Sequence, residues 1–225
     1  MKPKLTDSPL SIYLVDKTLV IQFPDVWQTL SWAPFNGGWG KSSCIFIHHL
    51  NKFDERDLDK IFEDQIKTRG IPENSVGLIT GAATEHFKEV FYKSKTLWVH
   101  AIATLGLSNA RTAGDEADAP TTNQPGTINL IVATNALPEL TGNLEAVHTA
   151  TMAKSAALME AGIRSKKSGQ IASGTGTDCI VICSTGEIME NYCGMHTLLG
   201  ELIGKAVREL LGKSIAFWKE KNIEL

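Results

Sequence analysis

Residues 173–183 read SGTGTDCIVIC, in which two Gly-Thr pairs lead into Asp178 and then into an apolar run. The run CIVIC predicts a buried strand, because short apolar runs rich in β-branched residues and bounded by turn formers are typical of strands. Glycine can adopt positive φ and lets another group approach the backbone closely. The turn before the strand is therefore predicted to be a tight connection or one wall of a site.

The composition of the chain favours one globular domain over residues 1–225, since 43% of the residues are hydrophobic and 21% are charged. The net charge is -3 and no long Lys/Arg block occurs, so we expect no nucleic-acid partner. No stretch reaches the roughly 18 apolar residues of a membrane span, and the N-terminus lacks a signal-peptide pattern. These features predict a soluble cytoplasmic protein without membrane insertion.

The four cysteines show no CxxC spacing. Two of them lie inside the apolar run CIVIC, where a free thiol behaves as a small hydrophobic group. We therefore expect buried thiols instead of disulfides or metal ligands, and no metal site.

The rest of the chain alternates β-type and helical patterns. Residues 11–23 predict a hairpin that turns at Asp16 and is closed by Pro24, and residues 28–50 read as strand, glycine-rich turn and strand. Apolar residues at helical spacing predict a helix from Asp54 to Thr68. Further predicted elements are strands at 75–82, 89–93, 96–107 and 127–134, and helices at 140–163 and from Leu198 onward.

The order of these elements indicates an α+β fold with a largely antiparallel or mixed sheet packed by two long C-terminal helices. In the last helix, Gly200 and Gly204 are expected to permit close packing. Residues 108–125 form a polar stretch that is longer than an ordinary connection, and such loops are often functional.

Five polar clusters punctuate the predicted strand ends and helix starts. They are NGG at 36–38, SNARTAGD at 108–115, GTIN at 126–129, GTGTD at 174–178 and GMHT at 194–197. GTGTD is not a typical phosphate loop, because it lacks the lysine and leads into a strand instead of a helix. No GxSxG, HExxH or cysteine-protease signature occurs, so no standard hydrolase triad can be assigned.

Taken together and in order, NARTAGD, GTIN, a helix with TATxAK, GTGTD and GxHTxLGELIGKAV resemble the adenosylcobinamide amidohydrolase family. The NGG turn resembles an early motif of that family, so the resemblance extends from about Asn36 to Val207. One departure is Met152, which stands where the family's helix is expected to carry glutamate. The departure raises the alternative of a corrinoid-binding or carrier protein that does not hydrolyse its ligand.

The resemblance implies hydrolysis of the amide that joins a propionyl side chain of the corrin ring to aminopropanol. The products would be adenosylcobyric acid and 1-amino-2-propanol, as in corrinoid salvage. The cobalt and the adenosyl group would arrive with the corrinoid, so the protein would require no cofactor of its own. A weaker alternative is an unrelated amide hydrolase that acts on a small acylated amine.

Amide hydrolysis requires a nucleophile, a base, an oxyanion donor and an acid for the leaving amine. Asp178 is predicted to be a general base or to orient one, although an Asx-type turn would also explain it. His196 is predicted as an acid or base and could instead cap a helix. Asn129 could donate its amide to the carbonyl oxygen or to a corrin amide, or be a plain strand residue. Lys154 could have a lowered pKa if it is desolvated, although most lysines in helices are solvated.

The residues predicted to bind the substrate come from four of the five clusters. They are Asn36, Gly37, Gly38, Asn109, Arg111, Asp115, Thr127, Gly174, Thr175, Gly176 and Thr177. Arg111 and Asp115 could instead form a local salt bridge. The threonine hydroxyls could act as nucleophiles, but threonine needs an adjacent base for this, so attack by water is preferred.

Two further expectations concern the surface. Trp32 and Trp39 flank the NGG turn and could cover a flat macrocycle, although core packing would also explain either residue. The near-neutral charge and the apolar helix faces make a homodimer possible.

Overall fold

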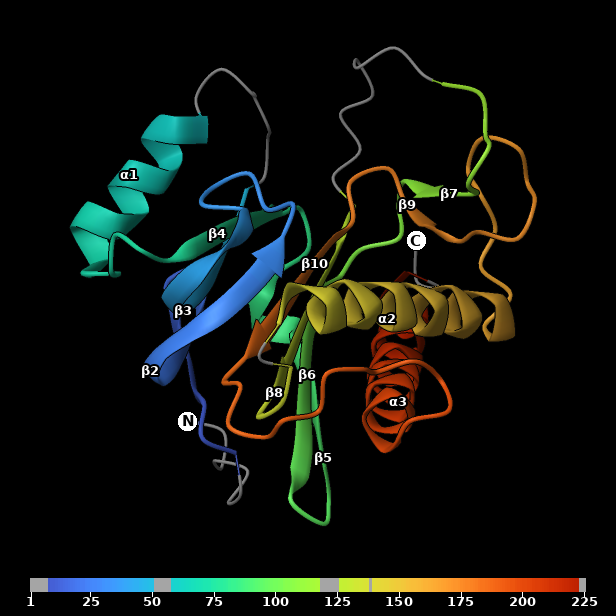
Figure 1. Ribbon diagram of the computed structural model, residues 1–225. Coiled ribbons are helices and arrows are strands. Elements are labelled where there is room, and N and C mark those ends of the chain that lie inside the picture. Colours follow the sequence, from blue (N-terminus) through green and yellow to red (C-terminus); the bar gives the residue numbers. More distant parts are fainter. Residues whose placement is uncertain (1–7, 51–57, 118–125, 138, 223–225) are drawn as a thin grey trace.

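The computed structural model describes residues 8–50, 58–117, 126–137 and 139–222. In this part of the chain, an eight-stranded sheet has the order β4-β3-β2-β10-β8-β6-β5, with β1 paired to β2, and β7 pairs with β9 in a separate ribbon (Figure 1). The strands are β1 (Ser11–Val15), β2 (Thr18–Ser31), β3 (Gly38–His49), β4 (Val76–Thr80), β5 (Lys88–Ser94), β6 (Leu97–Leu105), β7 (Ala110–Arg111), β8 (Ile128–Thr134), β9 (Gly174–Thr175) and β10 (Cys179–Ser184). The helices are α1 (Leu58–Arg69), a 3-10 turn at Thr84–His86, α2 (Leu140–Glu160) and α3 (Leu198–Asn222).

The predicted fold class is confirmed. The sheet is mixed, because β8 runs parallel to β10 and β3 runs parallel to β4, while the other neighbouring strands are antiparallel. The two long helices α2 and α3 lie on one side of the sheet and α1 lies on the other side (Figure 1). Among the described residues, no helix has both the length and the apolar character needed to cross a membrane.

Strand β2 takes part in both halves of the sheet. Its first half pairs with β1 and β3, and its last residues pair with β10 as well as with β3. The register with β3 shifts between Gln22 and Trp27. The prediction that Pro24 closes a hairpin is therefore wrong: the proline lies inside the strand, at the irregularity, where its missing N–H is tolerated.

Strands from the two parts of the sheet pack against each other as two layers. Ile21 of β2 and Ile45 of β3 belong to the same buried cluster as Ile131 of β8 and Val181 of β10. The alternate residues Leu130 of β8 and Ile180 of β10 belong instead to the cluster formed with α2 and α3. Strand β8 is buried along its whole length for this reason, because it is covered on both faces.

The ends of the elements differ in places from the sequence prediction. Helix α1 is described from Leu58 onward, and the predicted start at Asp54 lies outside the described residues. Helix α2 ends at Glu160, before the predicted residue 163, because Gly162 has φ 66° and the Ile163 N–H donates to the Leu158 carbonyl at 3.0 Å. This hydrogen bond is typical of a Schellman motif.

The two glycines of α3 behave differently. Gly200 packs against the carbonyl oxygens of Cys193 and Gly194, as predicted, so a side chain would not fit there. Gly204 has no atom within 4 Å of the position that a Cβ would take, and the prediction of close packing at this residue is wrong.

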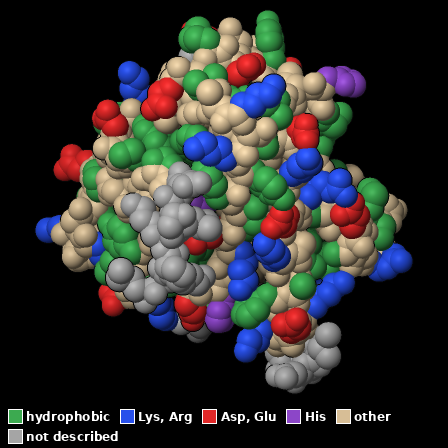
Figure 2. All heavy atoms as spheres, turned by 90° about the horizontal axis from the view of Figure 1, so that it is seen from below, with side chains coloured by type: hydrophobic (Ala, Val, Ile, Leu, Met, Phe, Trp, Pro, Cys, Tyr) green, Lys and Arg blue, Asp and Glu red, His purple; other side chains and the backbone are tan. Residues whose placement is uncertain are grey.

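The four cysteines are free and buried, as predicted. Burial raises the pKa of the Cys44 thiol to about 11 and the pKa of the Cys179 and Cys193 thiols to about 12. The pKa of the Cys183 thiol is raised for the same reason. On the surface, Figure 2 shows basic and acidic side chains interspersed on the face that is viewed from below.

Gly77 provides a test of the packing beneath α1. A Cβ at this residue would lie 2.7 Å from Phe46 and 3.0 Å from Phe62, which are both buried. We expect Gly77→Ala to lower the free energy of unfolding by about 1–3 kcal/mol, as overpacking does. The matched control Gly204→Ala should raise the free energy of unfolding by up to about 1 kcal/mol, since alanine favours the helix. Chemical denaturation measures both changes, and equal effects would contradict the packing described here.

Candidate functional site

Asp178 lies at the centre of a dense polar cluster at the start of β10. Its Oδ1 accepts hydrogen bonds from the Ile128 N–H at 3.1 Å and from the Thr175 hydroxyl. Its Oδ2 accepts hydrogen bonds from the Thr175 N–H at 3.1 Å and from the Lys154 ammonium. The carboxylate therefore connects three segments: the 174–178 turn, the start of β8 and helix α2.

Lys154 and Asp178 form a buried ion pair, with side-chain exposed fractions of 8% and 9%. Burial of two charges is costly and is compensated only by good geometry and further hydrogen bonds, which Thr175 and Ile128 supply here. Gly174 makes the pair possible, because a Cβ at this residue would lie 2.5 Å from Asp178 Oδ2 and 2.8 Å from Lys154 Nζ. Buried ionisable groups with specific partners occur often at functional sites.

Thr127 and Thr177 join the start of β8 to the GTGTD turn. The Thr127 hydroxyl donates to the Thr177 carbonyl at 2.7 Å, and the Thr177 hydroxyl donates to the Gly126 carbonyl at 3.1 Å. Both hydroxyl protons are thus engaged by backbone oxygens. The two residues were predicted to bind substrate, and their observed contacts hold the two segments together.

Two buried side-chain polar atoms in the described part of the chain have no hydrogen-bond partner, Asn109 Oδ1 and Thr104 Oγ1. Both lie beside the segment 126–129. A Cβ at Gly126 would lie 2.6 Å from Asn109 Oδ1, and Thr104 is opposite Asn129 in the β6–β8 register. Unsatisfied buried polar groups are rare in proteins and often have a functional explanation. These two atoms lie beside the segment that contacts Asp178, which makes this region a candidate for function.

Asn129 lies between the two layers of strands and is buried. Its Nδ2 donates to the Ile79 carbonyl at 2.8 Å and thereby ties β8 to β4. One of its two amide protons is thus engaged by the neighbouring strand, and donation to a substrate carbonyl stays a prediction.

Arg111 and Asp115 lie in the loop beside the cluster. Arg111 pairs with Gly174 in the β7–β9 ribbon, which the sequence analysis did not predict. Asp115 accepts hydrogen bonds from the Ser165 hydroxyl and from the Thr112 N–H at 2.8 Å. The Ser165 hydrogen bond is the largest cause of the lowered pKa of this half-buried carboxyl. Asp115 therefore holds the loop together instead of being free to clamp a substrate.

The NGG turn joins β2 to β3. Asn36 has φ 50° and donates from Nδ2 to the carbonyls of Glu73 at 2.9 Å and Ser75 at 3.0 Å. Gly37 lies against the Ala33 carbonyl so closely that a Cβ would collide with it, and Gly38 has φ 96°. The geometry of the turn therefore explains why asparagine and two glycines occur here. The Asp178 carboxylate contacts none of the three residues.

The structure does not bring His196 to Asp178. His196 is exposed, in the segment where the Cys193 N–H donates to Glu145 at 2.8 Å and the Cys193 carbonyl accepts from Thr149 at 3.0 Å. Glu145 lies about 13 Å before Lys154 along α2, by the rise of an α-helix. The GMHT segment therefore packs on the N-terminal half of α2 and not at the ion pair.

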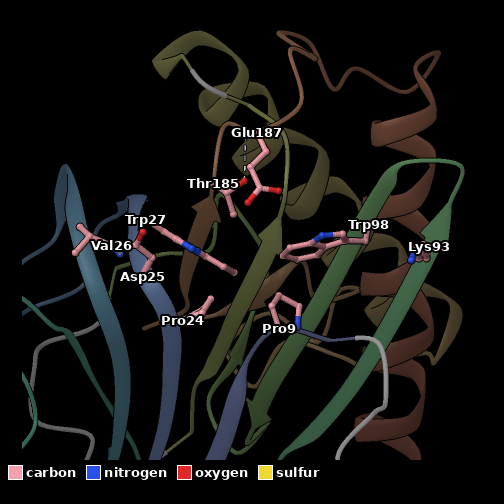
Figure 3. A pocket seen from close by; sticks show the side chains of 9 residues that line it. All are labelled: Pro9, Pro24, Asp25, Val26, Trp27, Lys93, Trp98, Thr185 and Glu187. Atoms are coloured by element: carbon pink, nitrogen blue, oxygen red, sulfur yellow. Dashed lines mark hydrogen bonds between the residues drawn. The ribbon is translucent and has the colours of Figure 1, made fainter.

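Two of the hollows on the described surface are lined by neither Asp178 nor Lys154. One, of about 500 Å³, is lined by Asn36 and Gly37 among others. The other, of about 480 Å³, lies at the opposite end of β10, where Trp27 and Trp98 face into it (Figure 3). The side chains of the ion pair are almost inaccessible, and Thr175, whose hydroxyl contacts Asp178, is half-buried.

Trp32 contributes a contact to this region that the sequence analysis did not predict. Its indole N–H donates to the Asp178 carbonyl at 2.7 Å, and 52% of the residue is exposed. The position of Trp32 beside the NGG turn was the only signal in the sequence. Thr104 gave no signal, since it lies within an apolar strand. No group of three or more His, Cys, Asp or Glu side chains that could hold a metal ion is found among the described residues.

Comparison with known proteins identifies related sequences. Residues 5–223 match the family model described as adenosylcobinamide amidohydrolase. An uncharacterized protein of Methanocaldococcus jannaschii is 31% identical over 214 residues, which cover 85% of this chain and 83% of that protein. An adenosylcobinamide amidohydrolase of Methanosarcina mazei is 26% identical over 209 residues, which cover 88% of this chain and 94% of that protein.

Similarity to solved structures is lower. A protein of Pyrococcus horikoshii has a TM-score of 0.42 and 15% identity, with 92% of this chain and 83% of that chain covered. The L-aminopeptidase D-Ala-esterase/amidase of Ochrobactrum anthropi has a TM-score of 0.38 and 9% identity, with the same coverage. The relationship to a family therefore comes from sequence alone.

The buried ion pair predicts a large loss of stability when one partner is removed. Lys154→Met leaves the Asp178 carboxylate buried without its cation, and we expect the free energy of unfolding to fall by about 3–5 kcal/mol. The double variant with Asp178→Asn should recover part of this loss. Lys205→Met is the matched control, since the Lys205–Glu201 pair is exposed and should contribute less than about 1 kcal/mol. Equal effects of the two lysine variants in urea denaturation would contradict a buried pair.

Proposed function

The chain belongs to the adenosylcobinamide amidohydrolase family, and we propose that it hydrolyses the amide joining the corrin propionyl side chain of adenosylcobinamide, or of a related cobamide, to aminopropanol. The products are adenosylcobyric acid and 1-amino-2-propanol, as corrinoid salvage requires. In this proposal the cobalt and the adenosyl group belong to the substrate, and the protein supplies no cofactor of its own.

The observation that supports this proposal best is the convergence of separate motifs on one carboxylate. GTGTD contributes Asp178 and Thr175, TATxAK contributes Lys154, and GTIN contributes the backbone N–H of Ile128. NARTAGD contributes Asn109, which lies against Gly126 of the GTIN motif. Residues that are far apart in the sequence thus meet around a single group that can accept a proton.

Asp178 is the proton acceptor in the proposed reaction. Lys154 donates to Oδ2 and leaves Oδ1 directed toward Thr175 and Ile128, so the ammonium holds the carboxylate in a fixed orientation. General acid–base catalysis of this kind contributes about 10²–10⁴-fold to a rate. The same carboxyl can then return the proton to the departing amine.

The exposed tryptophans offer a place for the corrin ring. Trp32 and Trp39 are 52% and 39% exposed, and Trp32 is fastened to the Asp178 carbonyl. Flat conjugated rings stack well on indole. A corrin that stacks on Trp32 would hold its amide-bearing fringe near the GTGTD turn.

Met152, which replaces an expected glutamate, is the residue that favours the alternative of a carrier protein. This residue precedes Lys154 by two positions on α2 and so lies about 200° around the helix axis from it. The methionine therefore points away from the side of the helix that pairs with Asp178, and the ion pair is complete without it. Hydrolysis is the better supported function for this reason.

Incubation of the purified protein with adenosylcobinamide tests the proposal. We expect mass spectrometry to detect adenosylcobyric acid and free aminopropanol, and Asp178→Asn should slow the reaction by about 10²–10⁴-fold because it removes the proton acceptor. Asp25→Asn, which changes an exposed carboxylate beyond the other end of β10, is the control and should leave the rate unchanged. Tight binding of a corrinoid that is recovered intact would favour the carrier alternative and overturn the proposal.

Trp32→Ala tests the place of the corrin ring. Loss of one stacking contact should raise KM by about 2–10-fold with little change in kcat, since such contacts contribute about 0.5–1.5 kcal/mol. Tyr192→Ala is the control, because Tyr192 is 63% exposed in another segment. Titration of the visible corrinoid spectrum measures the affinity directly, and an unchanged affinity for the Trp32 variant would contradict stacking at this residue.

A further inference from the structure

We propose that Thr175 is the nucleophile of this site and that the reaction passes through an ester between its hydroxyl and the corrinoid acyl group. This inference rests on the proposed function and specifies its mechanism. It replaces the expectation, drawn from the sequence, that water attacks the amide directly.

The hydrogen bonds distinguish Thr175 from the other two threonines of the cluster. The hydroxyls of Thr127 and Thr177 donate their protons to backbone carbonyls, which cannot accept a proton in a reaction. The Thr175 hydroxyl donates instead to the Asp178 carboxylate. Threonine needs an adjacent base to become nucleophilic, and Thr175 alone among the three has one.

The position of Thr175 also suits attack on a substrate. The residue is half-buried and contacts an ion pair that is almost inaccessible. Its backbone is fixed on two sides, by the pairing with Ala110 in the β7–β9 ribbon and by the N–H that donates to Asp178 Oδ2. Among the described residues, its oxygen accepts only a long hydrogen bond of 3.4 Å from the Thr177 N–H, so a lone pair is left for attack.

Asn109 supplies a donor for the oxyanion. Its Nδ2 lies 3.9 Å from the position that a Cβ of Gly176 would take, next to Thr175, and no described residue accepts a hydrogen bond from it. Its Oδ1 is buried without a partner. A side-chain amide whose oxygen and nitrogen make no hydrogen bond within the fold is free to bind a ligand. Asparagine side chains are known oxyanion donors. Gly176 leaves the approach open because it has no side chain.

The chemistry balances with water as the only co-reactant. The Thr175 oxygen attacks the amide carbonyl while its proton passes to Asp178, and the carbonyl oxygen becomes an oxyanion beside Asn109. The C–N bond then breaks, the proton passes from Asp178 to the nitrogen, and aminopropanol leaves. Water next attacks the ester carbonyl and gives up a proton through Asp178 to the threonine oxygen, which releases the corrinoid acid and restores the hydroxyl.

Lys154 is a positioning residue in this scheme, because it acts only through Asp178. Its ammonium holds Oδ2, and this leaves Oδ1 for the hydroxyl of Thr175. Lys154→Arg should retain part of the activity that Lys154→Met loses, since arginine keeps the charge.

The first experiment traps the ester. Wild-type protein is mixed with adenosylcobinamide and quenched in acid within the first turnover, and the masses of its peptides are measured. We expect the corrinoid acyl group on Thr175, and we expect Thr175→Val to lack the adduct and to lose at least about 10³-fold in hydrolysis. Thr175→Ser should form the adduct, and Asn109→Ala should slow hydrolysis by about 10²–10³-fold. Thr68→Val, an equivalent change on α1, is the control.

The second experiment does not depend on the corrinoid. A β-lactone acylates an activated hydroxyl: the hydroxyl oxygen attacks the lactone carbonyl, the ring C–O bond breaks and the proton passes to the released alkoxide. We expect peptide mapping of the wild-type protein to find this ester on Thr175 and not on Thr127 or Thr177. Circular dichroism of Thr175→Val checks its fold, and the mapping of the wild-type protein needs no variant.

The outcomes separate the two proposals. Hydrolysis by the wild type without an adduct, together with Thr175→Val activity within about 10-fold of the wild type, overturns Thr175 as nucleophile and leaves the amidohydrolase standing. Absence of hydrolysis by the wild type overturns the proposed function. In that case the corrinoid ester is overturned with it, and the β-lactone decides only whether Thr175 is the nucleophile of this site: labelling at this residue supports that assignment, and labelling elsewhere or nowhere overturns it.

Discussion

The buried ion pair between Lys154 and Asp178 is the interaction on which the site depends. Two charges that are removed from water are stable only if they pair with each other and if their other polar atoms form hydrogen bonds. In this molecule that requirement fixes helix α2, the start of β8 and the GTGTD turn relative to one another. Glycine at residue 174 is part of the same requirement, since any side chain there would occupy the space between the charges.

The polar side chains around the pair are of two kinds: some form hydrogen bonds that stabilise the fold, and others remain available to contact a ligand. Thr127, Thr177, Asn129 and Asp115 direct their polar atoms to backbone or to neighbouring side chains. Thr175 and Asn109 do not, because one points its hydroxyl at the carboxylate and the other leaves its amide unused. Thr175 and Asn109 are therefore the candidates for chemistry, although the sequence alone does not distinguish them from the other polar residues of the motifs.

Much of the fold follows from local patterns, and much of the site does not. The apolar run after Asp178 and the helical spacing before Lys154 predict β10 and α2, because these patterns express burial on one or two faces. Pro24 and Gly204 were misinterpreted, since a proline tolerated at an irregular strand and a glycine without close neighbours depend on distant partners. The position of His196 away from Asp178 could not be predicted either, because adjacency to a helix start does not specify where that helix begins in space.

Strand β10 comes late in the chain and yet lies in the middle of the sheet, between β2 and β8. During synthesis on the ribosome, β2 and β8 emerge long before the strand that separates them, and each exposes an unpaired edge until then. Contacts between residues so distant in sequence, such as Ser31 with Val181, also slow folding because a large loop must close first. The nascent protein therefore faces its greatest risk of aggregation before β10 is made, and chaperone assistance would matter most during that interval.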